Sequence, residues 1–344
     1  MAAPKLAAAI RTAVAAWELA TPFEQRADAL ADPGRLGVDL VSDVGKALIA
    51  AGEDLAAVRL EVLSAPFVVL PSVFEPVQLP VTPDWFTPVP DAVGTYAGRA
   101  AAIATQAFLG LESVSYGSEN SGELFVNLTT IPGDGKFARK SQGGLRGHTD
   151  AVSFPFNGEA DASNARIAPS PDVVTLVGLR NPKSVPTTVM VLQEALDKLS
   201  LEDIHELKQA QFSIESQATF LEGMRDILGD VHTAIEVPVL KDVAMGTIVR
   251  FSHSSVSPTA PGGAAETAAK NFAKACSEVA RAVAIQPGDV LLVSNRLCLH
   301  GRGEVGGEIG GQSRWLLRTY GLDTSQLDDS RRHLGDRPAH VLFP

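Results

Sequence analysis

The spacing of hydrophobic residues changes along the chain and divides the sequence into two parts. In the first third, Ala and Leu recur at helical spacing near residues 3–19, 42–63 and 91–110, which predicts amphipathic helices. Breaks that contain Pro and Gly separate these segments, for example at Asp32-Pro33-Gly34. We therefore expect residues 1–120 to be largely helical.

From about residue 122 onward, short segments rich in Val, Ile, Leu and Thr predict β-strands. These segments are GELFVNLTTI, PDVVTLVGL, TTVMVLQ, TIVRFS, AVAIQPGDVLLVS and RWLLRTYGL. Two stretches, 192–211 and 262–282, return to helical spacing. Because no regular helix follows each strand, the pattern predicts an antiparallel sandwich or barrel and not a doubly wound parallel sheet.

The predicted elements suggest one large domain of mixed α and β structure. A chain of 344 residues is long for an average domain, but single barrels reach this size when helices and insertions decorate them. We expect a single domain over 1–344, with a helical part at 1–120, a β core with inserted helices at 121–325 and a C-terminal tail at 326–344.

The charge and cysteine content exclude several classes of partner. A formal net charge of -11 disfavours a nucleic-acid partner, which needs clustered Lys and Arg. No apolar run reaches membrane-spanning length, and Glu18 and Glu24 interrupt the Ala-rich start, so it is not a signal peptide. Cys276 and Cys298 are too few for a disulfide framework or a thiolate zinc site. We expect a cytoplasmic protein.

One candidate metal-binding pair lies in the segment GGLRGHTDAVSFPF. Residues i and i+2 of a strand share a face, so His148 and Asp150 project side by side, at metal-ligand spacing. With 7 His and 40 acidic residues in the chain, roughly one such pair is expected by chance. A histidine at a strand end with a solvated neighbour is therefore the alternative.

A second segment, QPGDVLLVSNRLCLHGRGEVGGEIGGQSRWLLRTYGL, supports the metal interpretation. We expect the turn at 286–289 to start a strand that carries His300, and a Gly-rich turn to lead to a paired strand that carries Arg314. Two imidazoles and one carboxylate form the facial triad of non-haem Fe(II) oxygenases. Arg314 is suited to bind the terminal carboxylate of a co-substrate in a bidentate manner.

These motifs together resemble the clavaminate synthase-like branch of the taurine dioxygenase superfamily. The resemblance rests on HTD, PDVVTLVGLRNP, TTVMVL, LCLHGRG and SRWLLRTYG, which follow the order of the family between Gly122 and Gly321. It implies a double-stranded β-helix, a cupin-like jelly roll, decorated by N-terminal and inserted helices. It also implies an enzyme that uses Fe(II), 2-oxoglutarate and O2.

The resemblance assigns roles to individual residues of this chain. It implies that Fe(II) is bound by His148, Asp150 and His300. It implies that 2-oxoglutarate is bound by Arg314, with a hydroxyl from Thr187 or Thr188.

Candidate substrate residues follow from the same family. Arg318 is the expected partner of a substrate carboxylate, with a surface salt bridge as the alternative. Gln142 is a candidate contact for a substrate amino group, with a solvated loop glutamine as the alternative, and His253 is a candidate pocket residue. Arginine-specific members carry acidic residues where this chain has Ser252 and His253, which disfavours a guanidinium substrate.

The reaction implied is hydroxylation of an unactivated C–H bond of a free L-amino acid or a small derivative, with release of succinate and CO2. Related halogenases have Gly or Ala in place of the acid, so Asp150 favours hydroxylation or desaturation. Several alternatives remain open: an amino acid bound to a carrier protein, a non-catalytic metal-binding jelly roll, and a zinc hydrolase that uses the same three ligands.

Overall fold

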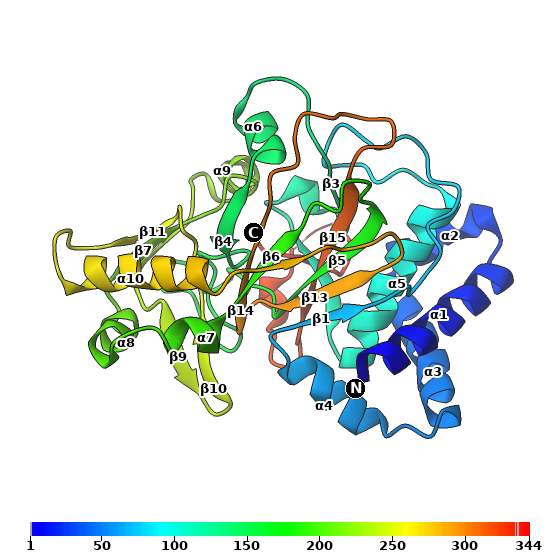
Figure 1. The fold of residues 1–344 in the computed structure, drawn as a ribbon, viewed down its shortest axis with the longest axis horizontal. Coiled ribbons are helices and arrows are strands. Elements are labelled where there is room, and N and C mark those ends of the chain that lie inside the picture. Colours follow the sequence, from blue (N-terminus) through cyan, green and yellow to red (C-terminus); the bar gives the residue numbers. More distant parts are fainter. Residues whose placement is uncertain (1, 334, 336) are drawn as a thin grey trace.

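The N-terminal helices pack on one face of a large β-sheet (Figure 1). The computed structural model describes residues 2–333, 335 and 337–344. The helices of this layer are α1 (Ala2–Ala20), α2 (Arg26–Ala31), α3 (Pro33–Ala50), α4 (Leu55–Ser64) and α5 (Val93–Leu109), and a short 3-10 turn, η1 (Phe23–Gln25), precedes α2. Helices α1 and α5 match the helical spacing near residues 3–19 and 91–110, whereas the segment between α4 and α5, described throughout, contains a strand and no helix.

The predicted helix over 42–63 was wrong, because the segment forms parts of two helices. Helix α3 ends at Ala50, and Gly52 then adopts a positive φ of 75°, a conformation that favours glycine. The side chain of Asp54 accepts hydrogen bonds from two backbone N–H groups and caps α4. The turn at Gly52 and the helix cap at Asp54 therefore divide a segment whose apolar spacing is continuous.

The large sheet has the strand order β1-β13-β5-β15-β2-β16, and β3 also pairs with β15. All its pairs are antiparallel except that of β2 with β16. Its strands are β1 (Phe67–Leu70), β2 (Glu112–Tyr116), β3 (Val126–Leu128), β5 (Val173–Arg180), β13 (Val290–Ser294), β15 (Trp315–Leu322) and β16 (Val341–Leu342). The expected C-terminal tail thus contributes a strand to this sheet.

Both faces of the large sheet are buried, and side chains alternate between them. On β5, Val173 and Val177 pack against the N-terminal helices, whereas Val174 and Leu176 face the interior between the two main sheets. This alternation follows from the two-residue period of a strand. The continuous apolar run of PDVVTLVGL is explained by burial on both sides.

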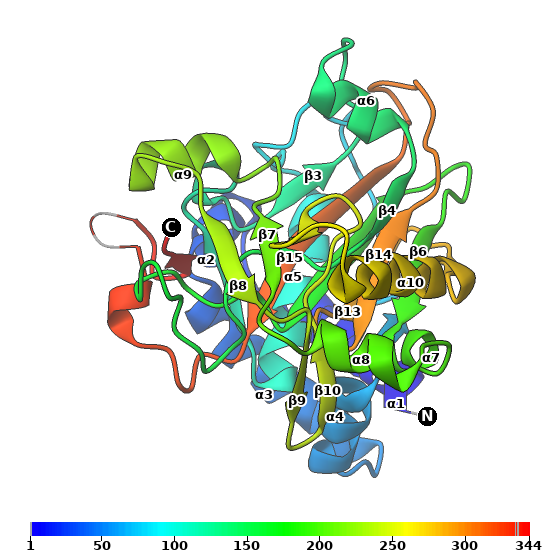
Figure 2. The same ribbon diagram turned by 90° about the vertical axis from the view of Figure 1, so that its left-hand side faces the viewer.

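A second sheet of four strands, in the order β12-β6-β14-β4, lies against the inner face of the large sheet. Its strands are β4 (Leu145–His148), β6 (Thr187–Val191), β12 (Arg281–Val283) and β14 (Cys298–Arg302). Val189 and Cys298 face the large sheet, whereas Met190 and Leu299 face a layer of helices. That layer, in front in Figure 2, contains α7 (Leu192–Leu196), α8 (Leu201–Leu207) and α10 (Ala264–Glu278).

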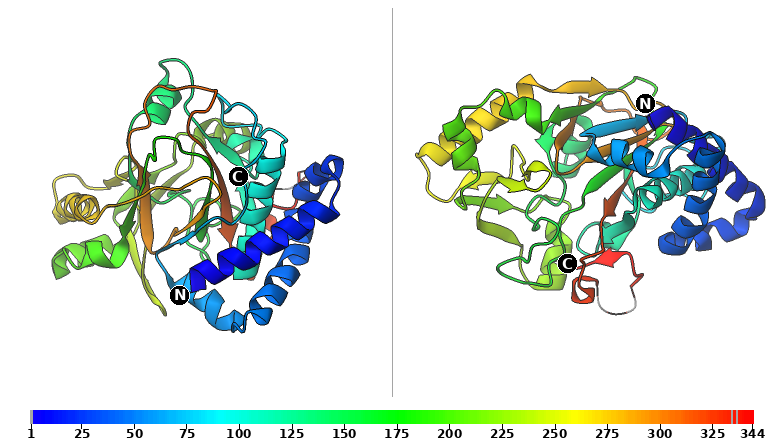
Figure 3. Two further views of the ribbon diagram at one scale, coloured as in Figure 1. Left: turned by 45° about the vertical axis from the view of Figure 1, so that its right-hand side comes forward. Right: turned by 90° about the horizontal axis from the view of Figure 1, so that it is seen from below.

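The molecule is therefore layered, with helices outside two facing sheets (Figure 3). The predicted antiparallel β core with N-terminal and inserted helices is confirmed. The predicted helix over 192–211 is two helices, α7 and α8, because Ser200 caps α8 through its side chain.

The predicted strand from the turn at 286–289 to His300 was also wrong. Strand β13 ends at Ser294 in the large sheet, and β14 begins at Cys298 in the four-stranded sheet. Between them the side chain of Asn295 hydrogen-bonds to backbone groups of Asp150 and Pro171. The chain therefore crosses between sheets at this point, and β14 does not pair with β15 as the expected hairpin required.

Smaller elements lie at the edges of the two main sheets. They are α6 (Lys136–Gln142), β7 (Phe212–Glu215), α9 (Leu221–Leu228), β8 (Thr233–Val237), β9 (Leu240–Val243), β10 (Gly246–Val249), β11 (Val256–Pro258) and the 3-10 turns η2 (Asn120–Gly122) and η3 (Asp329–Arg331). Helix α6 lies at one end of the sheets, at the top of Figure 1. Among the helices described, none combines the length and apolarity needed to span a bilayer.

Candidate metal centre

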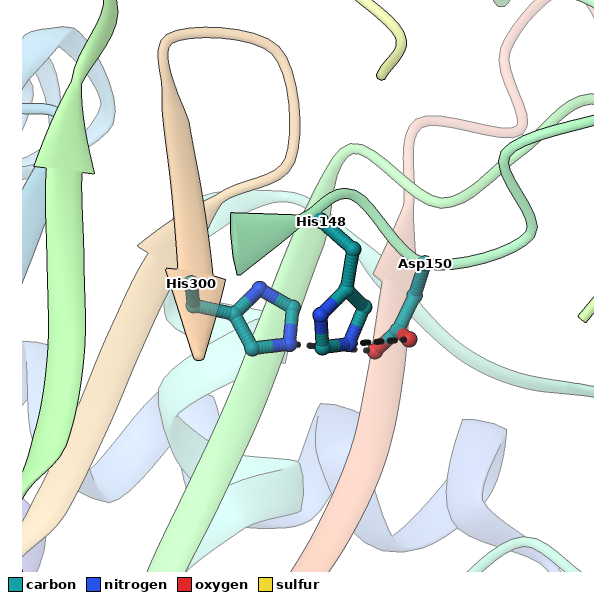
Figure 4. Close-up of side chains that lie close together, drawn as sticks. All are labelled: His148, Asp150 and His300. Atoms are coloured by element: carbon teal, nitrogen blue, oxygen red, sulfur yellow. Dashed lines mark ion pairs between the residues drawn. The ribbon is translucent and has the colours of Figure 1, made fainter. Parts of the chain in front are cut away.

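Three potential metal ligands meet in the space between the two main sheets. His148 ends β4 and is the register partner of His300 on β14. Asp150 follows β4, and its two carboxylate oxygens lie 3.6 Å from His148 Nε2 and 3.5 Å from His300 Nε2. One ligand atom from each residue lies within 4.8 Å of the others. Figure 4 shows that all three side chains converge on one point.

The backbone of Asp150 is fixed by Asn295. The Asn295 side chain accepts a hydrogen bond from Asp150 N at 2.8 Å and donates one to Asp150 O at 3.0 Å. The residue after it, Ala151, has a positive φ of 49°, which turns the chain away from the strand. The turn that interrupts the predicted strand therefore also positions the acidic ligand. The sequence analysis missed Asn295, although Ser-Asn after an apolar run is a turn signal.

The protonation of the cluster suits a divalent cation. The Nδ1 of His148 lies 3.0 Å from the carbonyl oxygen of Arg146. Because a carbonyl can only accept a hydrogen bond, Nδ1 carries the proton. The other ring nitrogen, Nε2, therefore presents its lone pair toward Asp150. Burial and the neighbouring His300 lower the pKa of His148 to about 3. Burial raises the pKa of Asp150, but Arg318 and His300 lower it more, so the carboxylate stays ionised.

The cluster also contains buried polar atoms without a partner. Among the described residues, nothing hydrogen-bonds to Asp150 Oδ2 or His300 Nδ1, although both atoms are buried. Native structures rarely leave such atoms unsatisfied. Two imidazoles and one carboxylate that converge on one point fit Fe(II).

A cavity of about 90 Å³ connects this cluster to Arg314. Arg314 is buried and forms no hydrogen bond or ion pair with any residue in the described part of the chain. Burial and the nearby Arg302 lower the pKa of Arg314 to about 9. A buried cation is normally paired, so this end of the cavity is suited to an anion. His300 and Arg314 thus share a cavity across the two sheets, although their strands are not paired.

The two threonine candidates are placed differently. Thr187 lines the cavity that contains Arg314, whereas Thr188 is the register partner of Gly301 and is not among the residues lining it. A Cβ at Gly301 would approach the Thr188 hydroxyl to 2.7 Å and the Leu145 carbonyl to 2.4 Å. Glycine is therefore required where β14 lies between its neighbours, and the geometry favours Thr187 as the co-substrate residue.

Arg318 lines the same cavity and is held by an acid that the sequence analysis missed. Its Nη2 lies 2.7 Å from Glu119 Oε1, and its Nη1 lies 3.9 Å from Asp150 Oδ2. Glu119 is buried and also accepts hydrogen bonds from Thr219 and Tyr320. Arg318 is thus not on a surface salt bridge, the alternative considered above. Glu119 follows a strand in SYGSEN without any motif that marks it.

A second cavity, of about 110 Å³, adjoins the first and is also lined by His148 and Asp150. Phe86 from an irregular loop and Phe137 from α6 line it, and their rings meet edge to face with centroids 5.7 Å apart. Arg302 fixes α6 by donating to the carbonyls of Lys140 at 2.7 Å and Gly143 at 3.0 Å. Helix α6 and the loop therefore enclose the space next to the metal ligands.

Comparison with solved structures finds the same architecture in two oxygenases. Asparagine oxygenase in complex with Fe(II), 2S,3S-3-hydroxyasparagine and succinate superposes with a TM-score of 0.73 and 20% identity, over 98% of this chain and 97% of that one. The non-haem iron oxygenase OrfP in complex with Fe, succinate and (3S)-hydroxy-L-Arg gives a TM-score of 0.72 and 21% identity, over 98% of both chains.

This chain has the fold of these oxygenases. The cupin-like fold implied by the family resemblance is thereby confirmed. A further OrfP structure, in complex with Fe and alpha-ketoglutaric acid, superposes with a TM-score of 0.71 and 20% identity over 98% of both chains. No protein-family profile and no curated protein matches the sequence. At this level of identity, the similarity establishes the fold and not the reaction.

The two remaining substrate candidates do not line the cavity that contains the metal ligands and Arg314. His253 lines a third, larger cavity, but its ring nitrogens face the carbonyls of Gly147 and Ala273 at 2.6 and 3.0 Å. Gln142 ends α6, and its side-chain amide donates to the Ile131 carbonyl at 3.5 Å. Gln142 does not line the cavities described here. Its contact with a substrate amino group stays a prediction that this geometry does not support.

Proposed function

We propose that this protein is an Fe(II)- and 2-oxoglutarate-dependent oxygenase that hydroxylates an unactivated C–H bond of a free L-amino acid or a small derivative. One observation carries the proposal: a complete His-Asp-His cluster and a buried, unpaired arginine share one cavity. Solved structures with this fold contain Fe and alpha-ketoglutaric acid. The proposal treats residues 1–344 as one oxygenase domain.

The residues of the cavity have separate roles in this proposal. His148, Asp150 and His300 hold Fe(II), and Arg314 binds the distal carboxylate of 2-oxoglutarate, assisted by the Thr187 hydroxyl. Fe(II), the Asp150 carboxylate and the co-substrate dianion carry one net negative charge, which Arg314 offsets. When bound, Fe(II) and 2-oxoglutarate supply the oxidising power, with O2 consumed and succinate and CO2 released.

The protein itself orients the substrate and excludes water. Arg318 and Glu119 present opposite charges beside the metal ligands, which suits the carboxylate and the ammonium group of a free amino acid. Phe86 and Phe137 close the cavity above them. An amino acid on a carrier protein has its carboxylate in a thioester, so Arg318 favours the free form as the partner molecule.

The unpaired arginine also distinguishes this function from the other metal-dependent alternatives. A zinc hydrolase with the same three ligands, or a jelly roll that only binds metal, has no use for a buried cation at the end of the cavity. Desaturation requires the same residues as hydroxylation and is distinguished by its product.

The test is optical and does not need the substrate. Anaerobic addition of Fe(II) and 2-oxoglutarate to the full chain is expected to produce a visible charge-transfer band. His148→Ala is expected to abolish the band, whereas His205→Ala, on the exposed face of α8, keeps it. Absence of the band from the unmodified protein contradicts the proposal.

A further inference from the structure

A third cavity, of about 600 Å³, continues from the metal centre. Lys140, Leu145, His148 and Gln217 line both this cavity and the smaller one beneath Phe86. Because His148 is a metal ligand, the larger cavity reaches the site of reaction. We call it the distal cavity; α6, β4, β7 and α9 contribute to its walls.

The distal cavity is lined by basic side chains. Lys136 and Lys140 come from α6, Arg146 from β4 and Arg225 from α9, whereas Glu215 is the single acidic residue among the lining residues. A basic cavity is unusual in a chain with a formal net charge of -11.

These four basic side chains form no ion pair with any residue that the structure describes. The lysines give the sharpest contrast. Eight lysines outside the distal cavity each lie within 4 Å of a carboxylate oxygen: Lys5, Lys46, Lys183, Lys198, Lys208, Lys241, Lys270 and Lys274. Lys136 and Lys140 are the exceptions, and both line the distal cavity. Both lysines are exposed to solvent, so their charges are available to an anion that enters the distal cavity.

We propose that the substrate is an amino acid whose side chain ends in a carboxylate, and that Lys140, with Lys136, Arg146 and Arg225 around it, binds that group. The inference rests on the proposed function and narrows its substrate class. Like charges repel within a cavity and opposite charges attract. The unpaired cations therefore favour an acidic side chain over a neutral one and disfavour an ammonium or guanidinium group.

Lys140 is the central residue of this inference because it belongs to both cavities. Arg318, the proposed partner of the substrate carboxylate, lines the smaller cavity, and Lys140 lines both the smaller and the distal cavity. Desolvation lowers the pKa of Lys140, as do Lys136 and Arg302, while Asp150 raises it. A bound carboxylate would offset the repulsion among these cations.

The other residues that line the distal cavity also disfavour a cationic substrate side chain. Ser252 and His253, which come from a segment between β10 and β11, also line the distal cavity. Neither residue presents a negative charge, so the distal cavity lacks a partner for a cationic side chain apart from Glu215.

The test compares isosteric amino acids by calorimetry under anaerobic conditions. The full chain, loaded with Fe(II) and saturating 2-oxoglutarate, is titrated with L-glutamate and L-glutamine, and with L-aspartate and L-asparagine. We expect at least one acid to bind about 10-fold more tightly than its amide. Equal or tighter binding of both amides overturns the inference.

Variants locate the effect at Lys140. Lys140→Gln is expected to weaken binding of the preferred acid about 10-fold and to change binding of its amide less than 2-fold. Lys274→Gln, an exposed lysine on α10, is the matched control and leaves both affinities unchanged. Equal losses for acid and amide in Lys140→Gln contradict a role in charge recognition.

The charge-transfer band separates the two proposals. If the band forms in Lys140→Gln and in the unmodified protein, the metal and co-substrate sites are intact, and a missing preference for acids refutes this inference alone. If no band forms in either protein, the proposed function fails first.

Discussion

Arg318 and Glu119 form a buried ion pair with an N···O distance of 2.7 Å in the wall of the metal-site cavity. Burial lowers the pKa of Arg318, but Glu119, Tyr320 and Asp150 together raise it more, so the guanidinium stays charged. Arg314, four residues earlier, has no such partner among the described residues. The two arginines therefore differ: Arg318 has a carboxylate partner inside the protein, whereas Arg314 has none among the described residues.

Removal of one member of the buried pair is expected to destabilise the fold. Arg318→Met leaves the Glu119 carboxylate buried with only hydroxyl donors, and we expect the free energy of unfolding to fall by about 3–5 kcal/mol. The double variant Glu119→Gln/Arg318→Met should recover part of this loss, because no uncompensated charge remains. Urea unfolding followed by circular dichroism measures both values. A single variant as stable as the unmodified protein would show that the pair is not structurally important.

Binding of 2-oxoglutarate is expected to depend on the guanidinium of Arg314. Arg314→Met removes a charged partner from a desolvated site, at a cost of about 2–5 kcal/mol, or roughly 30-fold or more in affinity. Arg314→Lys keeps the charge but loses the bidentate geometry, so its loss should be intermediate. Anaerobic titration of the charge-transfer band gives the dissociation constants. Arg35→Met, an exposed arginine on α3, should leave them unchanged.

The position of α6 is expected to depend on Arg302. This residue lies two positions after His300 and donates to the carbonyls of Lys140 and Gly143 at the end of α6. Arg302→Met removes both bonds, so the helix should open more often and expose its basic residues to trypsin. We expect cleavage within 136–140 to become several-fold faster, as measured by mass spectrometry of timed digests. An unchanged cleavage rate would mean that packing of Phe137 alone holds the helix.

Acid stability is expected to depend on the buried pair of Asp161 and His232, whose N···O distance is 2.9 Å. Burial raises the pKa of Asp161, but hydrogen bonds from His232 and Ser163 lower it more. The folded-state pKa therefore lies below the unfolded value of about 3.9. The pair stabilises the fold above about pH 4, and this contribution is lost as the pH falls through the folded-state pKa.

Asp161→Asn should therefore lower the free energy of unfolding at pH 7 by about 1–3 kcal/mol. The difference from the unmodified protein should shrink in the acid range, since Asp161 binds a proton there in the unfolded chain before it does so in the folded protein. Urea unfolding at pH 7 and pH 3 measures both. A difference that grows on acidification would reverse the assigned direction of the pKa shift.

Local sequence patterns predicted those features that are set by residues close together in the chain. His148 and Asp150 meet as expected, although Asp150 lies just beyond the end of β4. The two-residue alternation of β5 follows from strand geometry. Arg314 and Arg318 share a face for the same reason, and both line one cavity. Each of these features depends on residues within a few positions of one another.

Features that depend on contacts between distant segments were not predicted. The hairpin of His300 and Arg314 was wrong because Asn295 bonds to Asp150, 145 positions away, and sends the chain into the other sheet. Glu119 was missed because its partner Arg318 lies far along the chain in a neighbouring part of the sheet. Hydrophobic periodicity contains no information on such pairings.

The crossing at Asn295 places His300 on the four-stranded sheet and Arg314 beside β15 of the large sheet. A co-substrate held at one end by the metal ligands and at the other by Arg314 must therefore bridge the two layers. The separation of the layers is fixed by the packed side chains between them. If 2-oxoglutarate binds as proposed, the fixed distance between the two sheets selects the co-substrate by its length, because a diacid one carbon shorter or longer would reach only one of the two anchors.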